Sequence, residues 1–162
     1  MRRFICFLLL GAFLAVPVRG IEPVITRGEF LILLWEDSGG IPYDITAHPF
    51  TDLTGRDDLA QAAGWAWELG LIKGIGDGLF APDRSLTREE CAVLLRRFDA
   101  IWGREDDLPD LAICNDNENA SPWAGDALYR ACAAGRLPWK RGRLAPLEPV
   151  KAGEALACLA WR

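Results

Sequence analysis

The residues with the clearest chemistry in this sequence are a threonine, an arginine and a glutamate that occur twice at the same spacing. Thr26 to Glu29 and Thr87 to Glu90 both fit the pattern Ser/Thr-x-x-Glu of a capping box. In such a box the threonine hydroxyl and the glutamate carboxylate each accept a hydrogen bond from a backbone amide at the start of a helix. The pattern therefore predicts two helix starts and explains the threonine and the glutamate of each stretch.

The capping box does not explain the arginine that follows each threonine. Arg27 and Arg88 both lie near the start of a predicted helix, where a cation opposes the helix dipole at a cost of about 0.3–1 kcal/mol. An arginine beside free helix amides makes a site for an anion, above all a carboxylate that accepts two hydrogen bonds from one guanidinium. A salt bridge to a neighbouring carboxylate is the structural alternative, and the pattern leaves both open.

The glycines between residues 70 and 78 raise the question of a phosphate-binding loop. No glycine is followed by Lys and then Ser or Thr, so a Walker loop is excluded. Gly74, Gly76 and Gly78 lack the spacing of a dinucleotide loop, and an alanine-rich helix precedes them rather than a strand. We interpret these glycines as a reversal of the chain, with Gly70 ending a helix and Phe80 returning to the core.

Composition and charge exclude further classes of function. The chain has 162 residues, of which 23 are acidic and 18 are basic, and the absence of a basic patch argues against nucleic acid as a partner. The only histidine is His48, and no two cysteines have zinc-ligand spacing, so we expect no metal and no cofactor.

Residues 1–20 are predicted to be a secretory signal peptide. A basic start precedes an apolar run over residues 4–18, and cleavage is expected after Gly20. The run is shorter than the ~20 residues that span a bilayer, so no membrane contact is expected after cleavage. An exported chain can form disulfides.

Four cysteines follow this segment and allow two disulfides. Cys114 and Cys132 flank an insertion and are the candidate pair. Cys91 and Cys158 fall on two predicted helices, and the sequence leaves open whether they are buried thiols or a second bridge.

Internal repetition organises the rest of the chain. Residues 78–82, Gly-Leu-Phe-Ala-Pro, correspond to residues 142–146, Gly-Arg-Leu-Ala-Pro, and residues 25–29 correspond to residues 86–90. We therefore predict two and a half copies of one unit. The first is partial at residues 21–40, the second covers residues 41–105, and the third, degenerate copy covers residues 106–162.

Hydrophobic periodicity predicts that each full copy has a short alanine-rich helix, a glycine-rich connection and a longer apolar helix. Cys91, Leu94, Leu95 and Phe98 recur at steps of three and four and form one apolar stripe. The apolar run at residues 30–35 could be a strand, but its repeat partner favours a helix. Helices are expected at residues 26–36, 57–69, 87–102, 122–134 and 149–161.

In order and spacing, these motifs resemble the S-layer homology domain. That family has a Phe-x-Asp start, an alanine-rich helix, two glycine motifs and a Thr-Arg-x-Glu before an apolar helix. The matching segments are Phe50-x-Asp52, Gly70 to Gly74, Gly78 to Pro82 and Leu86 to Glu90. Together with the internal repeat, the resemblance covers nearly all of the chain beyond residue 20.

The resemblance implies an all-α, pseudo-threefold helical bundle, with three central helices, shorter outer helices and glycine-rich connecting loops. It also implies a secreted, non-catalytic module that attaches noncovalently to an anionic secondary cell wall polysaccharide, often pyruvylated, on a Gram-positive-type bacterium. In the family the Thr-Arg-x-Glu arginine lines grooves between units and binds the sugar. The glycan-binding residues carried over are Arg88, Arg27, Thr87, Thr26, Asp52, Lys73 and Gly74, and Glu29 and Glu90 are carried over as helix caps.

The sequence departs from the family pattern in two places. The third copy has Ala152 where the arginine is expected, and Lys151 or Lys140 could replace only its charge, not its fork of donors. The first copy lacks its outer helix. We therefore expect at most two competent grooves, and the alternative is a secreted structural or protein-binding module that has lost glycan affinity, with an unknown protein partner.

Other candidate sites have structural explanations. Asp52, Glu90 and Asp110 could supply paired carboxylates for glycoside cleavage, but no nucleophile–base pair is evident, so no enzyme activity is predicted. Residues 115–119 resemble a calcium loop but lack the glycine and distal glutamate of an EF-hand, so we expect a solvated loop. Trp65, Trp67, Trp123 and Trp139 could stack on sugars, although Trp67 is predicted to pack in the core.

Overall fold

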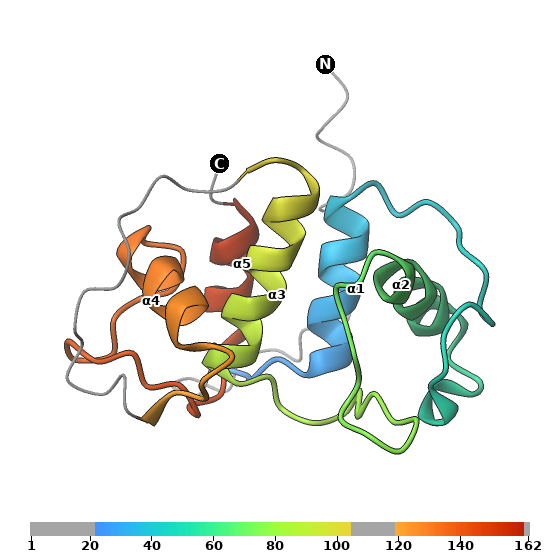
Figure 1. The fold of residues 1–162 in the computed structure, drawn as a ribbon, viewed down its shortest axis with the longest axis horizontal. Helices are drawn as coiled ribbons and strands as arrows, with labels where there is room; N and C mark the ends of the chain where they lie inside the picture. Colours follow the sequence, from blue (N-terminus) through green and yellow to red (C-terminus); the bar gives the residue numbers. More distant parts are fainter. Residues whose placement is uncertain (1–21, 105–118, 161–162) are drawn as a thin grey trace.

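The computed structural model describes residues 22–104 and 119–160, and within these ranges the regular structure is helical (Figure 1). The bridges between extended segments are isolated, and no strand forms in the described part of the chain. An all-α fold is therefore confirmed. The elements in chain order are α1 (Arg27–Asp37), the 3₁₀ helix η3 (Thr51–Leu53), α2 (Asp57–Glu68), α3 (Arg88–Ile101), α4 (Gly125–Ala133) and α5 (Ala152–Ala160).

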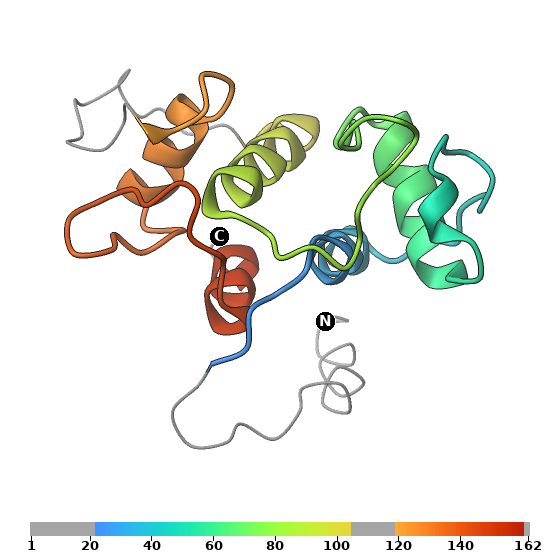
Figure 2. The ribbon, with the colours of Figure 1, turned by 90° about the horizontal axis from the view of Figure 1, so that it is seen from below.

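The three helices that end the predicted copies, α1, α3 and α5, lie together, and the two alanine-rich helices lie outside them (Figures 1 and 2). Helix α2 packs on α1, and α4 packs on α3. Each outer helix therefore covers the central helix of the preceding copy in the sequence, not that of its own copy.

The core follows the apolar stripes predicted from the sequence. Phe30, Leu31 and Leu34 of α1 have no exposed surface, and Leu95 and Phe98 of α3 are almost as deeply buried. The run at residues 30–35 is helical, as expected. Phe30 and Leu31 lie one turn before Leu34, so all three buried side chains point to the same side of the helix.

Helices α1 and α3 begin at capping boxes. The Thr26 hydroxyl accepts from the Glu29 amide, and the Glu29 carboxylate accepts from the Thr26 amide. Thr87 and Glu90 form the same reciprocal pair. In α5 only half of the box forms, since the Lys151 amide donates to Glu154 and position 151 offers no hydroxyl.

The first-turn amides of the three central helices are bound by segments from another copy. The Gly28 amide donates to the Pro82 carbonyl over 2.9 Å, and the Glu89 amide donates to the Pro146 carbonyl over 3.0 Å. At α5 the Gly153 amide instead donates to the Glu22 carboxylate over 3.0 Å. A side chain thus replaces the loop carbonyl that the partial first copy does not have.

The residues that precede the three helix starts form a closed ring of backbone hydrogen bonds. The Ile25 amide donates to the Val150 carbonyl, Val150 donates to Leu86, and Leu86 donates to Ile25, over 3.0, 2.9 and 3.0 Å. These three residues occupy the same position in the three copies. The ring therefore joins the copies at one end of the central helices.

The connecting turns use left-handed backbone conformations, as the glycine pattern predicts. Gly70 ends the α2 segment with φ of 70°. Ala81 and Ala145, at equivalent positions of the second and third copies, both adopt positive φ, 58° and 50°. Residues other than glycine rarely adopt a positive φ. The same uncommon turn therefore occurs in both copies.

Two expectations need correction. The predicted helices at residues 122–134 and 149–161 begin three residues later than expected, at Gly125 and Ala152. Trp67 does not lie in the core, because it is 39% exposed, and its ring packs edge-on with that of Phe50. The buried face of α2 is lined instead by Ala62, Ala63 and Ala66, and the helical turn places Trp67 beside that face rather than on it.

The structure describes three of the four cysteines that follow residue 20. Cys91 and Cys158 are buried free thiols. Burial raises the pKa of the Cys91 thiol, whereas a hydrogen bond from Cys91 lowers that of Cys158. No disulfide joins two residues within the described ranges, and the proposed pair of Cys132 with Cys114 involves a residue outside them.

Three other expectations also fall outside the described residues: the signal peptide, Asp110 and most of the acidic loop at 115–119. In the part of the chain that the structure covers, no helix has the length and hydropathy needed to cross a bilayer.

Candidate functional site at the junctions between copies

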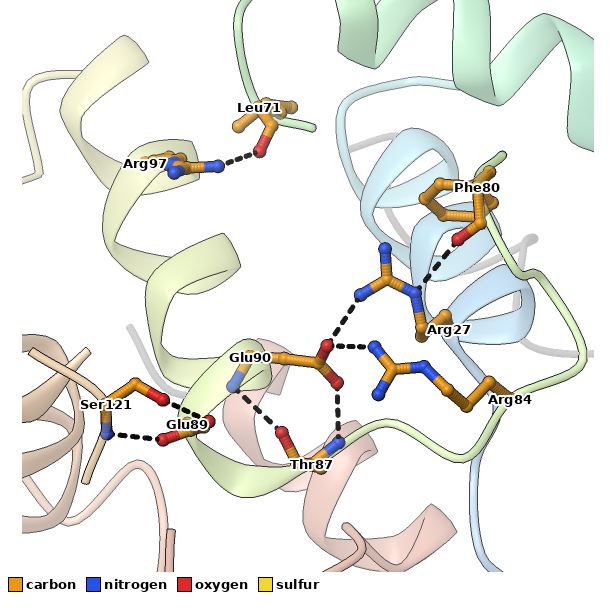
Figure 3. Close-up of polar contacts among 9 residues, drawn as sticks. All are labelled: Arg27, Leu71, Phe80, Arg84, Thr87, Glu89, Glu90, Arg97 and Ser121. Carbon is orange, nitrogen blue, oxygen red and sulfur yellow. Dashed lines mark hydrogen bonds and ion pairs between the residues drawn. The ribbon is translucent and has the colours of Figure 1, made fainter. Parts of the chain in front are cut away.

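Arg27 reaches from α1 into the second copy. Its Nε donates to the Phe80 carbonyl over 3.1 Å, and its Nη1 donates to Glu90 Oε1 over 3.0 Å (Figure 3). The guanidinium also lies 4.9 Å from the centre of the Phe80 ring, within the range of a cation–π contact. We call Arg27, Phe80, Arg84 and Glu90 the first junction.

Glu90 is the anion at the centre of the first junction. Its Oε1 accepts from both Arg27 and Arg84, while its Oε2 accepts from the Thr87 amide (Figure 3). The Glu90 and Arg27 side chains are only 14% and 10% exposed, whereas the Arg84 side chain is 46% exposed. Burial lowers the pKa of the Arg27 guanidinium; Glu90 opposes this shift and Arg84 adds to it.

Arg88 makes the corresponding contact with the third copy. Its Nε donates to the Leu144 carbonyl over 2.8 Å, and its Nη2 donates to the Pro138 carbonyl over 2.8 Å. Leu144 is the repeat equivalent of Phe80, so the two arginines bind the same loop position in successive copies. Arg88 has no exposed surface, and its Nη2 also lies 3.4 Å from Cys132 Sγ.

The second junction consists of Arg88, Leu144, Lys140, Glu148 and Glu154, and it differs from the first in its charges. Glu154, the equivalent of Glu90, is paired with Lys140 rather than with an arginine. Arg88 Nη1 is buried and has no partner in the described residues, whereas Arg27 Nη1 is paired with Glu90. Glu148 stands at the position of Arg84 and is exposed.

The missing third arginine has a structural counterpart. Ala152 stands at the equivalent position of α5. Its amide donates to the Pro23 carbonyl over 2.8 Å, as the amides of Arg27 and Arg88 donate to the equivalent carbonyls of Arg84 and Glu148. The start of α5 is thus bound through its backbone in the same way as the starts of α1 and α3, but without the side-chain link.

Asp52 and Gly74 support the loop that Arg27 binds. Asp52 accepts hydrogen bonds from the amides of Phe80 and Ala81, the shortest over 2.7 Å. Gly74 has φ of 73°, and a Cβ there would lie 2.6 Å from the Leu79 carbonyl oxygen. Both residues are therefore required by the loop itself, while Lys73 is exposed.

The helix amides expected to be free for an anion are occupied. Besides the Gly28 and Glu89 bonds, the Arg27 amide donates to the Arg84 carbonyl over 2.9 Å, and the Arg88 amide donates to the Glu148 carbonyl over 3.0 Å. An anion at either junction must therefore be bound by side-chain donors. The alternative of a salt bridge, left open by the sequence, is realised for Arg27 with Glu90 but not for Arg88.

Sequence reasoning missed Arg84 of the first junction and Glu89, the neighbour of Glu90 in the chain. Arg84 lies in the loop before the capping box, where no periodicity marks a residue as part of a site. Glu89 is buried and accepts from the amide and hydroxyl of Ser121, both over 3.0 Å (Figure 3). Within the second copy, Arg97 of α3 donates to the Leu71 carbonyl over 2.8 Å (Figure 3).

The residues described by the structure contain no group of three His, Cys, Asp or Glu side chains arranged to hold a metal ion. The site is thus defined by cations, carboxylates and backbone carbonyls. These groups can bind an anion or a hydroxylated ligand.

Comparison with known proteins identifies the unit that supplies Phe80, Arg84 and Glu90 to the first junction. Residues 49–92 match the S-layer homology domain. The chain carries an S-layer homology domain. Such a domain is a non-catalytic module that anchors proteins at the cell surface and binds cell wall polysaccharides.

Two relatives extend the match beyond this unit. Cell surface glycoprotein 1 of Acetivibrio thermocellus is 28% identical over 120 residues, which is 70% of this chain and 5% of that protein. An endoglucanase of Bacillus sp. strain KSM-635 is 30% identical over 109 residues, 66% of this chain and 11% of the enzyme. The chain thus spans a small fraction of the length of these relatives.

Proposed function

We propose that this chain attaches noncovalently to an anionic secondary cell wall polysaccharide, such as a pyruvylated one, as a non-catalytic module secreted to the wall of a Gram-positive-type bacterium. The observation that carries the proposal is the S-layer homology domain at residues 49–92. The similarity to a cell surface glycoprotein over 70% of the chain supports the same placement.

The residues proposed for glycan binding contribute in two ways. Lys73 can contact a polymer from the surface because it is exposed, whereas Arg27, whose side chain is 10% exposed, contributes through its ion pair with Glu90. Thr26, Thr87, Asp52 and Gly74 hold the helix starts and the loop in place. Contact of a polymer with Arg88 would require movement of the loop that covers it, since that side chain has no exposed surface.

We also infer that the three central helices and their loops form a pseudo-threefold arrangement, divided at residues 41 and 106. Support comes from the closed ring of hydrogen bonds among Ile25, Leu86 and Val150. The equivalent contacts of Arg27 with Phe80 and of Arg88 with Leu144 add to it.

The test is co-sedimentation of the purified protein, from residue 21 onward, with sacculi from a Gram-positive-type wall. Sacculi from which the secondary polymer has been removed by hydrofluoric acid run beside the intact ones. We expect binding to intact sacculi, loss of binding to stripped sacculi, and competition by the released polymer. A folded protein that ignores intact sacculi from several wall types would exclude the proposal.

A structural or protein-binding module is the second candidate. The burial of Arg88 and the absence of an arginine at position 152 favour it, because both reduce the number of cations that a polymer can reach. Binding that survives removal of the polymer, or that occurs only with wall proteins present, would support this alternative. Sacculi treated with protease before the assay separate the two.

A further inference from the structure

The two junctions share their geometry but differ at one exposed position. In the first junction this position is Arg84, and in the second it is Glu148. Both lie in the loop just before the start of a central helix, and both are exposed. A cation in one copy is thus replaced by an anion in the other at the edge that faces solvent.

Arg84 has unused hydrogen-bonding capacity. One nitrogen, Nη2, donates to Glu90 Oε1, while Nε and Nη1 have no acceptor among the described residues. The side chain is 46% exposed, compared with 10% for Arg27. Of the arginines in the two junctions, Arg84 is therefore the one that can offer donors to a ligand from solution.

The neighbours of Arg84 favour an added anion rather than an added cation. Glu90 is the nearest carboxylate, and both of its oxygens are already occupied, one by the two arginines and the other by the Thr87 amide. Arg27 and Arg84 donate to the same oxygen of Glu90, so the two cations repel each other. This repulsion contributes to the lowered pKa of Arg27. A second carboxylate on the outer side of Arg84 would relieve this repulsion.

We propose that Arg84 is the contact for a carboxylate group of the wall polysaccharide and that the first junction alone is competent, since Glu148 repels the same group at the second. This rests on the proposed function and deepens it. The ligand class is a glycan with carboxylate substituents, because a guanidinium fork matches a planar carboxylate with two donors. Arg27 acts through Glu90, by fixing the carboxylate that orients Arg84.

The experiment measures co-sedimentation with intact wall sacculi for the protein from residue 21 onward and for matched variants. Arg84→Gln removes the proposed contact, and Arg56→Gln is its control. Arg56 is an arginine of similar exposure, 43%, which pairs with Asp83 outside both junctions. Glu148→Gln changes the equivalent position of the second junction. Circular dichroism and the urea midpoint establish that each variant is folded.

Arg84→Gln is expected to weaken binding about tenfold, as loss of a charge-assisted contact implies, while Arg56→Gln and Glu148→Gln bind no more weakly than the unmodified protein. Arg84→Lys keeps the charge without the fork and is expected to fall between. Polygalacturonate, a carboxylated glycan, should compete for binding more effectively than polyphosphate.

The outcomes separate this inference from the proposed function. If the unmodified protein does not bind sacculi, the proposed function fails and the inference fails with it. If the protein binds but Arg84→Gln binds equally well, only the inference is overturned. Equal losses in Arg84→Gln and Arg56→Gln, or better competition by polyphosphate, would also overturn it.

Discussion

The two junctions bind the same loop position with the same atom, yet their surroundings differ. In each, an arginine Nε donates to the carbonyl of the residue after Gly-x, Phe80 in the first and Leu144 in the second. In the first junction, Arg27 contacts an aromatic ring and a carboxylate. In the second junction, Arg88 contacts a further backbone carbonyl and a sulfur atom. The arginine thus ties successive copies together in both, and only the first couples this tie to a surface charge.

This difference shows that the arginine of the Thr-Arg-x-Glu motif can have two roles, which occur together in one junction and apart in the other. The link from helix start to loop is needed wherever a later copy supplies a loop. The second role is an ion pair with the capping-box glutamate of the next copy, which Arg27 makes with Glu90, whereas Lys140 makes it with Glu154. The buried Arg88 keeps the first role, and Arg27 with Arg84 carries both.

The largest effect that would test this comparison is on stability. Arg88→Ala should lower the free energy of unfolding by about 3–4 kcal/mol, since the buried carbonyl of Leu144 loses its donor and a cavity remains. Arg27→Ala should cost about 2 kcal/mol, because Glu90 keeps Arg84 and water can reach the exposed edge. Urea unfolding, followed by circular dichroism, measures both. Equal losses would contradict the distinction between the junctions.

The loop that Arg27 binds offers the next test. Asp52→Ala should lower the free energy of unfolding by about 2 kcal/mol, because the amides of Phe80 and Ala81 lose their shared acceptor. Hydrogen exchange at these two amides should accelerate more than exchange in α4, which lies in the other outer layer. Uniform acceleration throughout the chain would show that the loop is not a separate support.

The capping boxes should contribute equally in the two junctions. Thr26→Ala and Thr87→Ala are each expected to cost about 1 kcal/mol, since each removes one side-chain acceptor from a helix start. Thermal unfolding of the two variants under the same conditions provides the comparison. A much larger loss for Thr87→Ala would mean that its box also supports the contact of Arg88 with the third copy.

The smallest effect is a gain. Lys151→Thr should raise the free energy of unfolding by about 0.5–1 kcal/mol, because Glu154 already accepts from the amide of residue 151 and a hydroxyl would complete the box. Lys151→Ala is the matched control and should not bring the same gain. Loss of stability in Lys151→Thr would indicate that the lysine has a contact beyond the half box.

Much of the fold could be predicted from the sequence because it depends on local patterns. The capping boxes at Thr26 and Thr87 and the apolar stripe from Cys91 to Phe98 act within one or two turns of helix, so spacing alone marks them. The glycine turns are equally local, since a positive φ at Gly70 follows from the need to end a helix. The helix at residues 30–35 required its repeat partner, because an apolar run alone has no period.

The candidate site was less accessible to sequence reasoning. Trp67 was placed in the core, but the narrow buried face of α2 is filled by alanines. Arg84 is not predicted as a site residue, because its partner Glu90 already has a capping role. No local pattern indicates that the same carboxylate also pairs with two arginines. The helix amides were expected to be free, although loops from another copy occupy them.

The sequence by itself determined the helices, their starts and the repetition, since these follow from backbone hydrogen bonding and side-chain period within a few residues. Only the tertiary structure decided what the repeated arginines contact. Arg27 and Phe80, or Arg88 and Leu144, lie more than one helix apart in the chain, and whether a guanidinium is buried or exposed depends on which loop folds over it. Burial is a property of the assembled copies. Both motif arginines are buried, but Arg27 Nη1 is paired with Glu90, whereas Arg88 Nη1 has no partner among the described residues.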